Sequence, residues 1–219
     1  PSIAMMIFIS IYSVVDGLFV SNFAGKEALA AVNLVFPLVM ALGSVGFMFG
    51  TGGAALVAKT MGEGDQVRAN RLFSLIAVAG TALGIVLAGV GAGILGPLLE
   101  ALGAQGTLKD QGLAYGFILL AALPFSIMQN MFQSFFIAAE RPKVGLAATI
   151  AAGVANIVLD YLFIAVLGWG IAGAALATAL GQALAAVAAV AFFASSKTSR
   201  LRFARPTADF RALGKTCVN

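Results

Sequence analysis

The stretch GVANIVLDYLFIAVLGWGIAGAALATALGQ, residues 153–182, decides the fold because it is apolar almost throughout. It predicts the second half of one membrane helix, a tight turn at residues 167–171 and the first half of the next helix. Asn156 and Asp160 are four residues apart and therefore share one helix face, and Thr178 and Gln182 repeat that spacing. An acid in so apolar a segment indicates a functional site, because a charged group costs several kcal/mol at membrane depth.

Composition predicts a membrane protein. The 219 residues are 61% hydrophobic and 10% charged, and their mean hydropathy is +1.01, more than a soluble domain needs. Histidine is absent, which excludes His-dependent catalysis and most zinc sites, and the single Cys217 cannot form an internal disulfide. No nucleic-acid partner is expected, because the sequence has no pattern of a nucleic-acid-binding module.

Six apolar segments are each long enough to cross a bilayer as a helix, which takes about 20 residues. They predict an all-α membrane protein, a six-transmembrane-helix bundle embedded in the lipid bilayer. The expected spans are 1–23, 33–58, 72–99, 112–139, 144–167 and 171–194, followed by a basic tail or inter-lobe linker at 195–219. We expect the first helix to be truncated, because the chain is already apolar at Pro1.

The distribution of basic residues predicts the orientation of the bundle. If the first helix runs from inside to outside, only Lys26 and Lys109 of the 13 Lys and Arg residues lie outside. The others lie in the segments 59–71 and 140–143 and in the tail, as the positive-inside rule requires. The even number of helices then leaves both ends of the chain cytoplasmic.

Three polar residues are expected at one depth. Asp16 precedes the end of its span by seven residues, Asp160 precedes Gly168 by eight, and Thr178 follows the start of its span by seven. At 1.5 Å per residue all three lie roughly 11–12 Å below the outer helix ends. We therefore expect one cavity in the outer half of the membrane, with Asn156 one turn deeper.

Two interpretations of Asp16 and Asp160 follow. They are either buried structural acids hydrogen-bonded to neighbours, or a site for a proton or cation. Enclosed carboxyl groups near each other can take up and release a proton, and carboxylate, amide and hydroxyl oxygens suit a hard cation such as Na⁺. We favour the ion site, with Asn156 and Thr178 as ligands or supporting groups. Ordinary interhelical hydrogen bonding is the alternative for these two.

The span 112–139 carries a second polar group near its inner end. Gln129, Asn130 and Gln133 lie within five residues of one another. They either face a path for substrate or join neighbouring helices through hydrogen bonds.

Several motifs together resemble one family of transporters. They are VVDGLFVSNFAGKEALAAVNLVFPL at 14–38, AKTMGEGDQVRANRLF at 58–73, ERPK at 140–143, and NIVLDYLFI with GWGIAGAALATALGQ at 156–182. They are similar to those of the multidrug and toxic compound extrusion (MATE) family, in particular its bacterial and archaeal branch typified by DNA-damage-inducible protein F. The resemblance covers nearly the whole chain.

The resemblance implies one lobe of a twelve-helix antiporter rather than an enzyme. Members have two six-helix lobes, alternate between outward- and inward-open states, and exchange H⁺ or Na⁺ for organic, often cationic, substrates. A cytoplasmic membrane of a bacterium or archaeon, no cofactor beyond the coupling ion, and a missing carboxy-terminal lobe of the same chain are implied. The matching positions for the cation site are Asp16, Asn156, Asp160 and Thr178, and Pro1 matches a proline linked to bending of the first helix.

Three other functions are the alternatives. A lipid-linked oligosaccharide flippase of the same superfamily is expected to carry basic residues in its cavity, whereas every Lys and Arg here lies in a loop, an edge or the tail. An intramembrane aspartyl protease needs two facing carboxylates, but VVDGLF and IVLDYL do not resemble the YD and GxGD motifs of that class. A passive channel would use acidic rings or carbonyl filters, and neither is evident.

Overall fold

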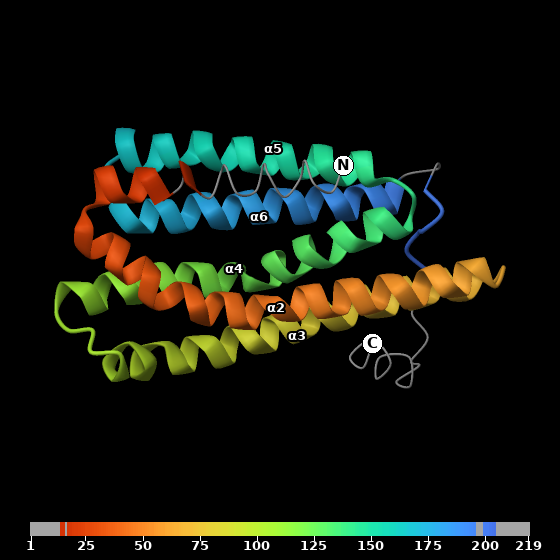
Figure 1. Cartoon of the computed structure of the whole chain (residues 1–219), viewed down its shortest axis with the longest axis horizontal. Helices are drawn as coiled ribbons and strands as arrows, with labels where there is room; N and C mark the ends of the chain where they lie inside the picture. The colour runs from red at the N-terminus through yellow and green to blue at the C-terminus, as the bar shows by residue number, and fades with distance from the viewer. Residues whose placement is uncertain (1–13, 16, 196–198, 205–219) are drawn as a thin grey trace.

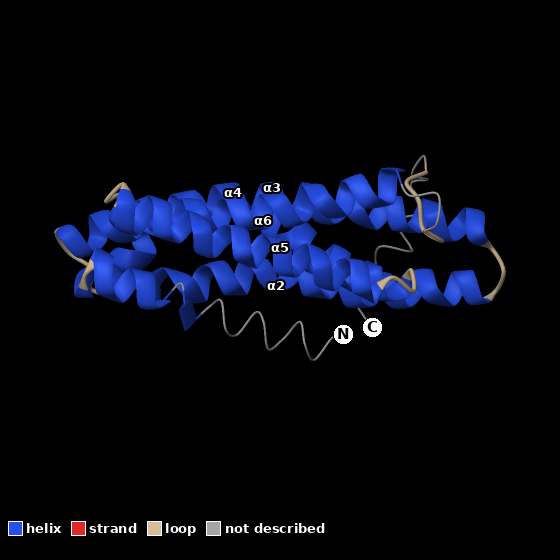
Figure 2. Ribbon diagram, turned by 90° about the horizontal axis from the view of Figure 1, so that it is seen from above, coloured by secondary structure: helices blue, strands red, loops and turns tan. Residues whose placement is uncertain are grey.

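The computed structural model describes residues 14, 15, 17–195 and 199–204 of the chain. In these residues every regular element is a helix, and the helices lie lengthwise beside one another (Figures 1 and 2), which confirms the all-α fold class. The elements are the π-helical turn η1 (Val20–Ala24), α2 (Lys26–Gly62), α3 (Gln66–Ala101), α4 (Thr107–Ala138), α5 (Pro142–Asp160), the π-helical turn η2 (Tyr161–Val166) and α6 (Gly170–Ser195).

Five described segments are long and apolar enough to span a membrane. They are α2, α3, α4, the continuous segment Pro142–Val166 and α6. Each corresponds to one of the predicted spans; the first predicted span, 1–23, lies mostly outside the described residues. All five helices begin before the predicted spans, and α2 begins at Lys26, where the predicted span begins at residue 33. The physical reason is that a helix can continue through charged residues outside the lipid. The hydropathy of the sequence does not indicate where such a helix ends.

Local signals fix the helix ends. Before α3, the Asp65 carboxylate accepts a hydrogen bond from the backbone N–H of Arg68 at 2.9 Å and caps the helix. Helix α5 starts with Pro142, whose missing N–H costs nothing in the first turn. The turn into α6 contains Gly168 and Gly170 with φ values of 68° and 54°, a backbone region that other residues rarely adopt.

Helix α4 lies at the centre of the bundle. It packs against α2, α3 and α6, whereas α5 packs mainly against α6 and meets α4 only sparsely. Figure 1 shows α5 and α6 on one side of α4, with α2 and α3 on the other. Helix α6 therefore forms the floor of a gap between α4 and α5.

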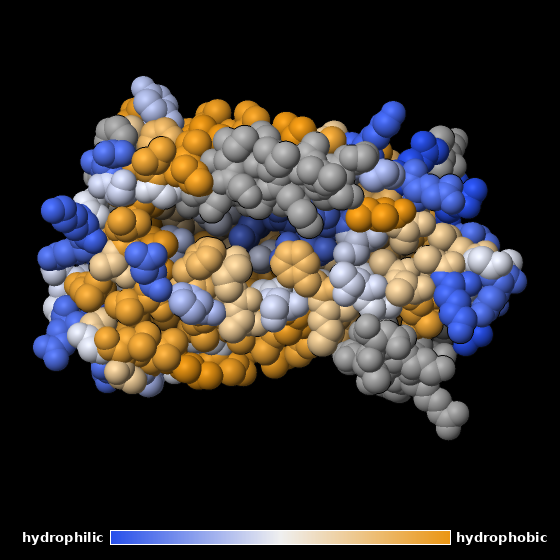
Figure 3. All heavy atoms as spheres, viewed as in Figure 1, coloured by the Kyte–Doolittle hydropathy of each residue, from blue (hydrophilic) through white to orange (hydrophobic). Residues whose placement is uncertain are grey.

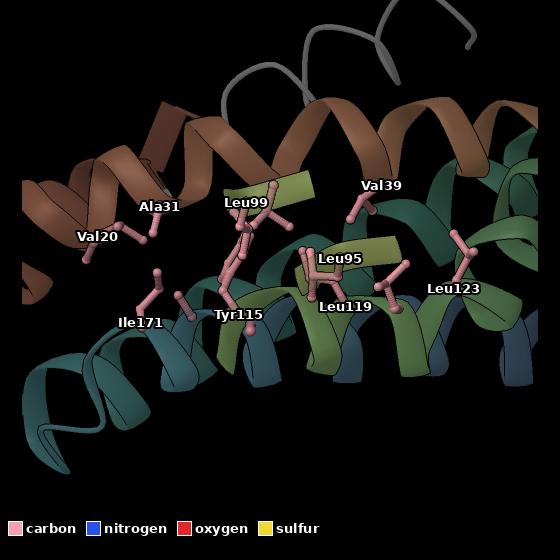
Figure 4. Packing of buried hydrophobic residues seen from close by; sticks show 14 of the residues in the cluster. Val20, Ala31, Val39, Leu95, Leu99, Tyr115, Leu119, Leu123 and Ile171 are labelled. Carbon is pink, nitrogen blue, oxygen red and sulfur yellow. The ribbon is translucent and has the colours of Figure 1, made fainter. Parts of the chain in front are cut away.

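The buried apolar residues form two clusters along the bundle. The first joins α2, α3 and α4 to η1 and the start of α6, through residues such as Val39, Leu95 and Ile171 (Figure 4). The second, which we call the aromatic cluster, lies nearer the end of the bundle at which α4 and α6 finish. Its rings are Phe73, Phe132, Phe135, Phe136, Phe192, Phe193 and Phe203.

The two ends of the bundle differ in charge. We call one the basic end, where α2, α4 and α6 finish and α3 and α5 begin. Its described basic residues on loops and helix ends are Lys59, Arg68, Arg71, Arg141, Lys143, Arg200 and Arg202. At the opposite end Lys109 pairs with Glu100 at 2.6 Å. Hydrophilic side chains gather at both ends, with an apolar band between them (Figure 3), as expected for a membrane-spanning bundle.

Candidate functional site: a polar groove between α4, α5 and α6

The site is built around Asp160, the last residue of α5. Its side chain is 0% exposed, and it is the only acid buried among the described residues. The chain changes there from an α-helix to the π-helical turn η2. Such wide turns within helices are frequent at functional sites, because they rotate the side chains beside them.

Asn156 lies one helical turn before Asp160 and is 4% exposed. Within the described part of the chain, neither its Nδ2 nor its Oδ1 has a hydrogen-bond partner. A buried polar group without a partner costs about 1–3 kcal/mol. The α6 backbone approaches closely at this point, because a Cβ on Gly181 would lie 3.3 Å from the Asn156 Cβ. The amide is therefore held in place by packing rather than by its own hydrogen bonds.

Asn156 opens onto a cavity of about 30 Å³. The cavity is bounded by polar residues and by small residues that let the helices approach. Its lining residues are Gln129, Thr149, Ala152, Gly153, Asn156, Thr178, Gly181 and Gln182. A water molecule needs about 10–15 Å³ of such volume, and an organic ligand needs several hundred. The cavity therefore suits a small cation or about two water molecules.

A second cavity of about 10 Å³ shares Gln129 and Thr149 with the first and adds Gln133, Phe132 and Phe136. Since these residues lie nearer the end of α4, the two cavities extend along the gap toward the basic end. We call them together the polar groove. Figure 3 shows hydrophilic surface in a hollow at the middle of the face where α4 and α6 lie.

The structure brings several of the predicted site residues together. Asn156 and Thr178 line one cavity although they come from different helices. Asp160 lies one turn further along α5, fully buried, and is not part of the cavity lining. Asp16 and Pro1 lie outside the described residues.

The polar residues of α4 separate into two groups. Gln129 and Gln133 line the polar groove. Asn130 lies on the contact with α2, where a Cβ on Gly46 would be 3.2 Å from the Asn130 Cβ. The three residues predicted as a group therefore face different neighbours.

Sequence reasoning passed over Thr149 as a lining residue and gave Gln182 no role. A signal for both exists in their spacing, because Thr149 precedes Asn156 by seven residues and Gln182 follows Thr178 by four. Both spacings place the residues on the same helix face as their predicted partners. The Thr149 hydroxyl donates to the Gly145 carbonyl at 3.0 Å, which fixes its rotamer.

The chemistry of the groove is that of neutral oxygen and nitrogen donors beside one acid. Among the residues that the structure describes, its lining includes no Lys or Arg. In the same residues, His, Cys, Asp and Glu form no group of three that could bind a metal. Amide and hydroxyl oxygens can coordinate a cation, and a buried carboxyl group can hold a proton.

Long apolar helices around a buried acid and a polar groove are typical of polytopic membrane proteins that move ions or small molecules. The family model named MatE matches residues 1–162, and the chain belongs to the MATE family of transporters.

The chain is similar to known members over almost its whole length. It is 25% identical to the "Multidrug export protein MepA" of Staphylococcus saprophyticus over 91% of this chain and 45% of that protein. The structure described as "Crystal structure of MATE in the straight conformation" is 25% identical, with a TM-score of 0.89 over 97% of this chain and 48% of that one. A MOP superfamily transporter from Pyrococcus furiosus, described as having reverse polarity of its binding pocket, is 25% identical with a TM-score of 0.90, over 98% of this chain and 48% of that one. The chain thus spans about half the length of these relatives.

Proposed function

We propose that this chain is the amino-terminal lobe of an ion-coupled exporter of organic, cationic compounds. The observation that carries the proposal is the buried Asp160 one turn from Asn156, a buried residue that lines a small polar cavity. The Staphylococcus relative is named a multidrug export protein, and this chain matches about half of that protein's length. A second lobe of the same chain is part of the proposal.

The coupling ion is H⁺ or Na⁺, and its site comprises Asp160, Asn156 and Thr178, with Asp16 of the first helix. Protonation of Asp160 neutralises a negative charge in an apolar region. A bound Na⁺ compensates the same negative charge with its positive charge. Either event changes the relative stability of two alternative packings of the first helix. An ion that binds one state better than the other shifts the population toward that state and so drives alternating access.

The substrate needs more room than the groove offers. Its cavities of about 30 and 10 Å³ fall well below the several hundred Å³ of a drug-sized site. Substrate therefore binds where the groove opens toward the second lobe, with Gln129 and Gln133 along its path. The neutral lining favours organic cations over the anionic lipid-linked sugars of a flippase, because the latter need basic groups inside the cavity.

The test uses the two-lobe protein reconstituted in proteoliposomes. Efflux of a fluorescent cationic dye is recorded under separate Na⁺ and H⁺ gradients for wild type, Asp160→Asn and Asp16→Asn. Gradient-driven efflux is expected in wild type and is expected to be lost in both variants. The gradient that drives it identifies the ion.

Asp110→Asn is the matched control, because Asp110 is exposed at the start of α4, far from the groove. It is expected to transport as wild type does. Efflux that survives in both Asp160→Asn and Asp16→Asn would make these acids structural and end the ion-site proposal. Gradient-independent leakage in wild type would favour a passive channel.

A further inference from the structure

Residues 199–204 follow α6 and run without helical structure along the basic end of α3. They belong to the predicted basic tail at 195–219. Leu201 is fully buried, whereas Phe203 is 38% exposed, and its ring centroid lies 5.0 Å from that of Phe73.

Three hydrogen bonds fasten this segment to polar side chains of α3. Gln66 Nε2 donates to the Arg200 carbonyl, the Arg202 N–H donates to Asn70 Oδ1 at 3.1 Å, and the Ala204 N–H donates to Ser74 Oγ at 2.8 Å. The α3 residues are four apart, and the residues of the segment are two apart. Four helical residues rise about 6.0 Å and two extended residues about 6.6 Å, so the two spacings match.

Successive residues of the segment alternate between hydrogen bonds to α3 and packing into the aromatic cluster. Backbone groups of Arg200, Arg202 and Ala204 bond to α3, while Leu201 and Phe203, between them, pack into the aromatic cluster. The Arg200 guanidinium also reaches Glu140, in the connection between α4 and α5, at 2.9 Å. The segment thus contacts α3, the aromatic cluster and the α4–α5 connection at the basic end.

The aromatic cluster connects this segment to the polar groove. The Phe203 ring meets the Phe132 ring edge-on, with centroids 6.3 Å apart. Phe132 in turn lines the part of the groove nearest the basic end, together with Phe136. The Phe132 ring therefore lies between the segment and the groove, and it contacts the rings of Phe73, Phe135 and Phe193 as well as that of Phe203.

We propose that residues 199–204 form a strap, fastened to the Gln66–Asn70–Ser74 face of α3, which closes the basic end of the polar groove by supporting Phe132. Release of the strap removes Phe203 from the cluster and lets Phe132 move, which opens the groove to water at that end. This role does not depend on which ion or substrate the protein carries, so it can fail or succeed independently of the proposed function.

The experiment disrupts one hydrogen bond from both sides. Ser74→Ala removes the acceptor, and Ala204→Pro removes the donor while keeping the extended backbone that precedes a proline. Thr81→Ala, which removes a hydroxyl that bonds within α3 at 2.8 Å, is the control. All are made in the full chain carrying Cys217→Ser and Ala148→Cys, since Ala148 lines the groove.

Two readouts are taken in lipid nanodiscs: amide hydrogen exchange of residues 199–204 and the rate at which a water-soluble thiol reagent modifies the cysteine at position 148. Loss of one hydrogen bond is expected to raise the population of the released strap about fivefold. Both rates rise accordingly in Ser74→Ala and Ala204→Pro, and the double variant adds little. Unchanged exchange in Thr81→Ala and in the α3 core shows that the fold is intact.

Two results would overturn the proposal. One is rapid exchange of the Arg202 and Ala204 amides already in wild type, which means that the strap is not fastened. The other is a faster strap exchange without faster thiol modification, which means that the strap does not close the groove.

Discussion

At the scale of single residues, Asn156 is a buried polar group that lowers the stability of the fold. Its amide is buried, and within the described residues it has no hydrogen-bond partner. Folding alone would favour an apolar side chain of the same size at this position, because an unsatisfied amide weakens the folded state. Retention of such a group fits a site that a ligand completes, since natural proteins accept local destabilisation where function needs it.

We predict that Asn156→Leu separates these two effects. The unfolding temperature in detergent is expected to stay equal to wild type or to rise, because the unsatisfied amide is replaced by an apolar group of similar volume. The stabilisation by Na⁺ or by low pH, measured by the same thermal unfolding, is expected to vanish.

Thr60→Val is the control for this prediction. Thr60 is also a buried polar residue, but it lies on α2 away from the groove, and its hydroxyl bonds within that helix at 2.9 Å. The variant is expected to retain the ion response. A lower unfolding temperature together with an intact ion response in Asn156→Leu would contradict the interpretation of Asn156 as a ligand.

At the scale of elements, close helix packing at glycines sets the geometry of the groove. A Cβ on Gly46 of α2 would lie 2.9 Å from both the Cα and the carbonyl oxygen of Ile127 on α4. These are backbone atoms, so the contact cannot be relieved by a change of rotamer. The approach of α2 holds α4 in position and thereby the groove-lining Gln129, two residues after Ile127.

We predict that Gly46→Ala destabilises the protein by about 1–3 kcal/mol, the usual cost of overpacking. Gly93→Ala on α3 is the control, because its Cβ would meet nothing within 4 Å; it is expected to be neutral or slightly stabilising, since alanine favours a helix. Thermal unfolding of both variants in the same detergent is the measurement. Equal unfolding temperatures would show that α2 and α4 can separate at no cost.

At the scale of the whole molecule, charge determines how the bundle lies in the membrane. The basic end carries Arg141 and Lys143 in and after the α4–α5 connection, whereas Lys26 begins α2 at the opposite end. From the positive-inside rule we expect the basic end, with residues 199–204, on the cytoplasmic side of the membrane.

We predict that a cysteine replacing Lys143 in a Cys217→Ser background reacts with a membrane-impermeant thiol reagent only in inside-out vesicles. A cysteine replacing Lys26 is expected to react only in right-side-out vesicles. Labelling from the reverse sides would invert the orientation, and the groove would then open toward the cytoplasm at its Asn156 end.

Much of the fold was predictable because hydropathy and spacing are local properties of the sequence. Asn156 and Asp160 share a helix face wherever that helix lies, and the apolar runs predicted five helices that the structure confirms. Helix α2 begins at Lys26, before the span predicted from residue 33, because charged residues such as Lys26 and Glu27 are compatible with a helix outside the lipid. The ion role of the polar residues stays a prediction.

The sequence by itself determined the class of the protein, its apolar helices and the residues whose burial in the membrane costs the most free energy. It did so because the cost of placing a polar group in lipid depends mainly on the group. Only the tertiary structure decided which of those residues meet. Asn156 and Thr178 lie on one cavity, Asn130 faces α2, and residues 199–204 fold back onto α3. These pairings follow from how helices far apart in the chain pack against one another, and no periodicity within a single helix encodes that.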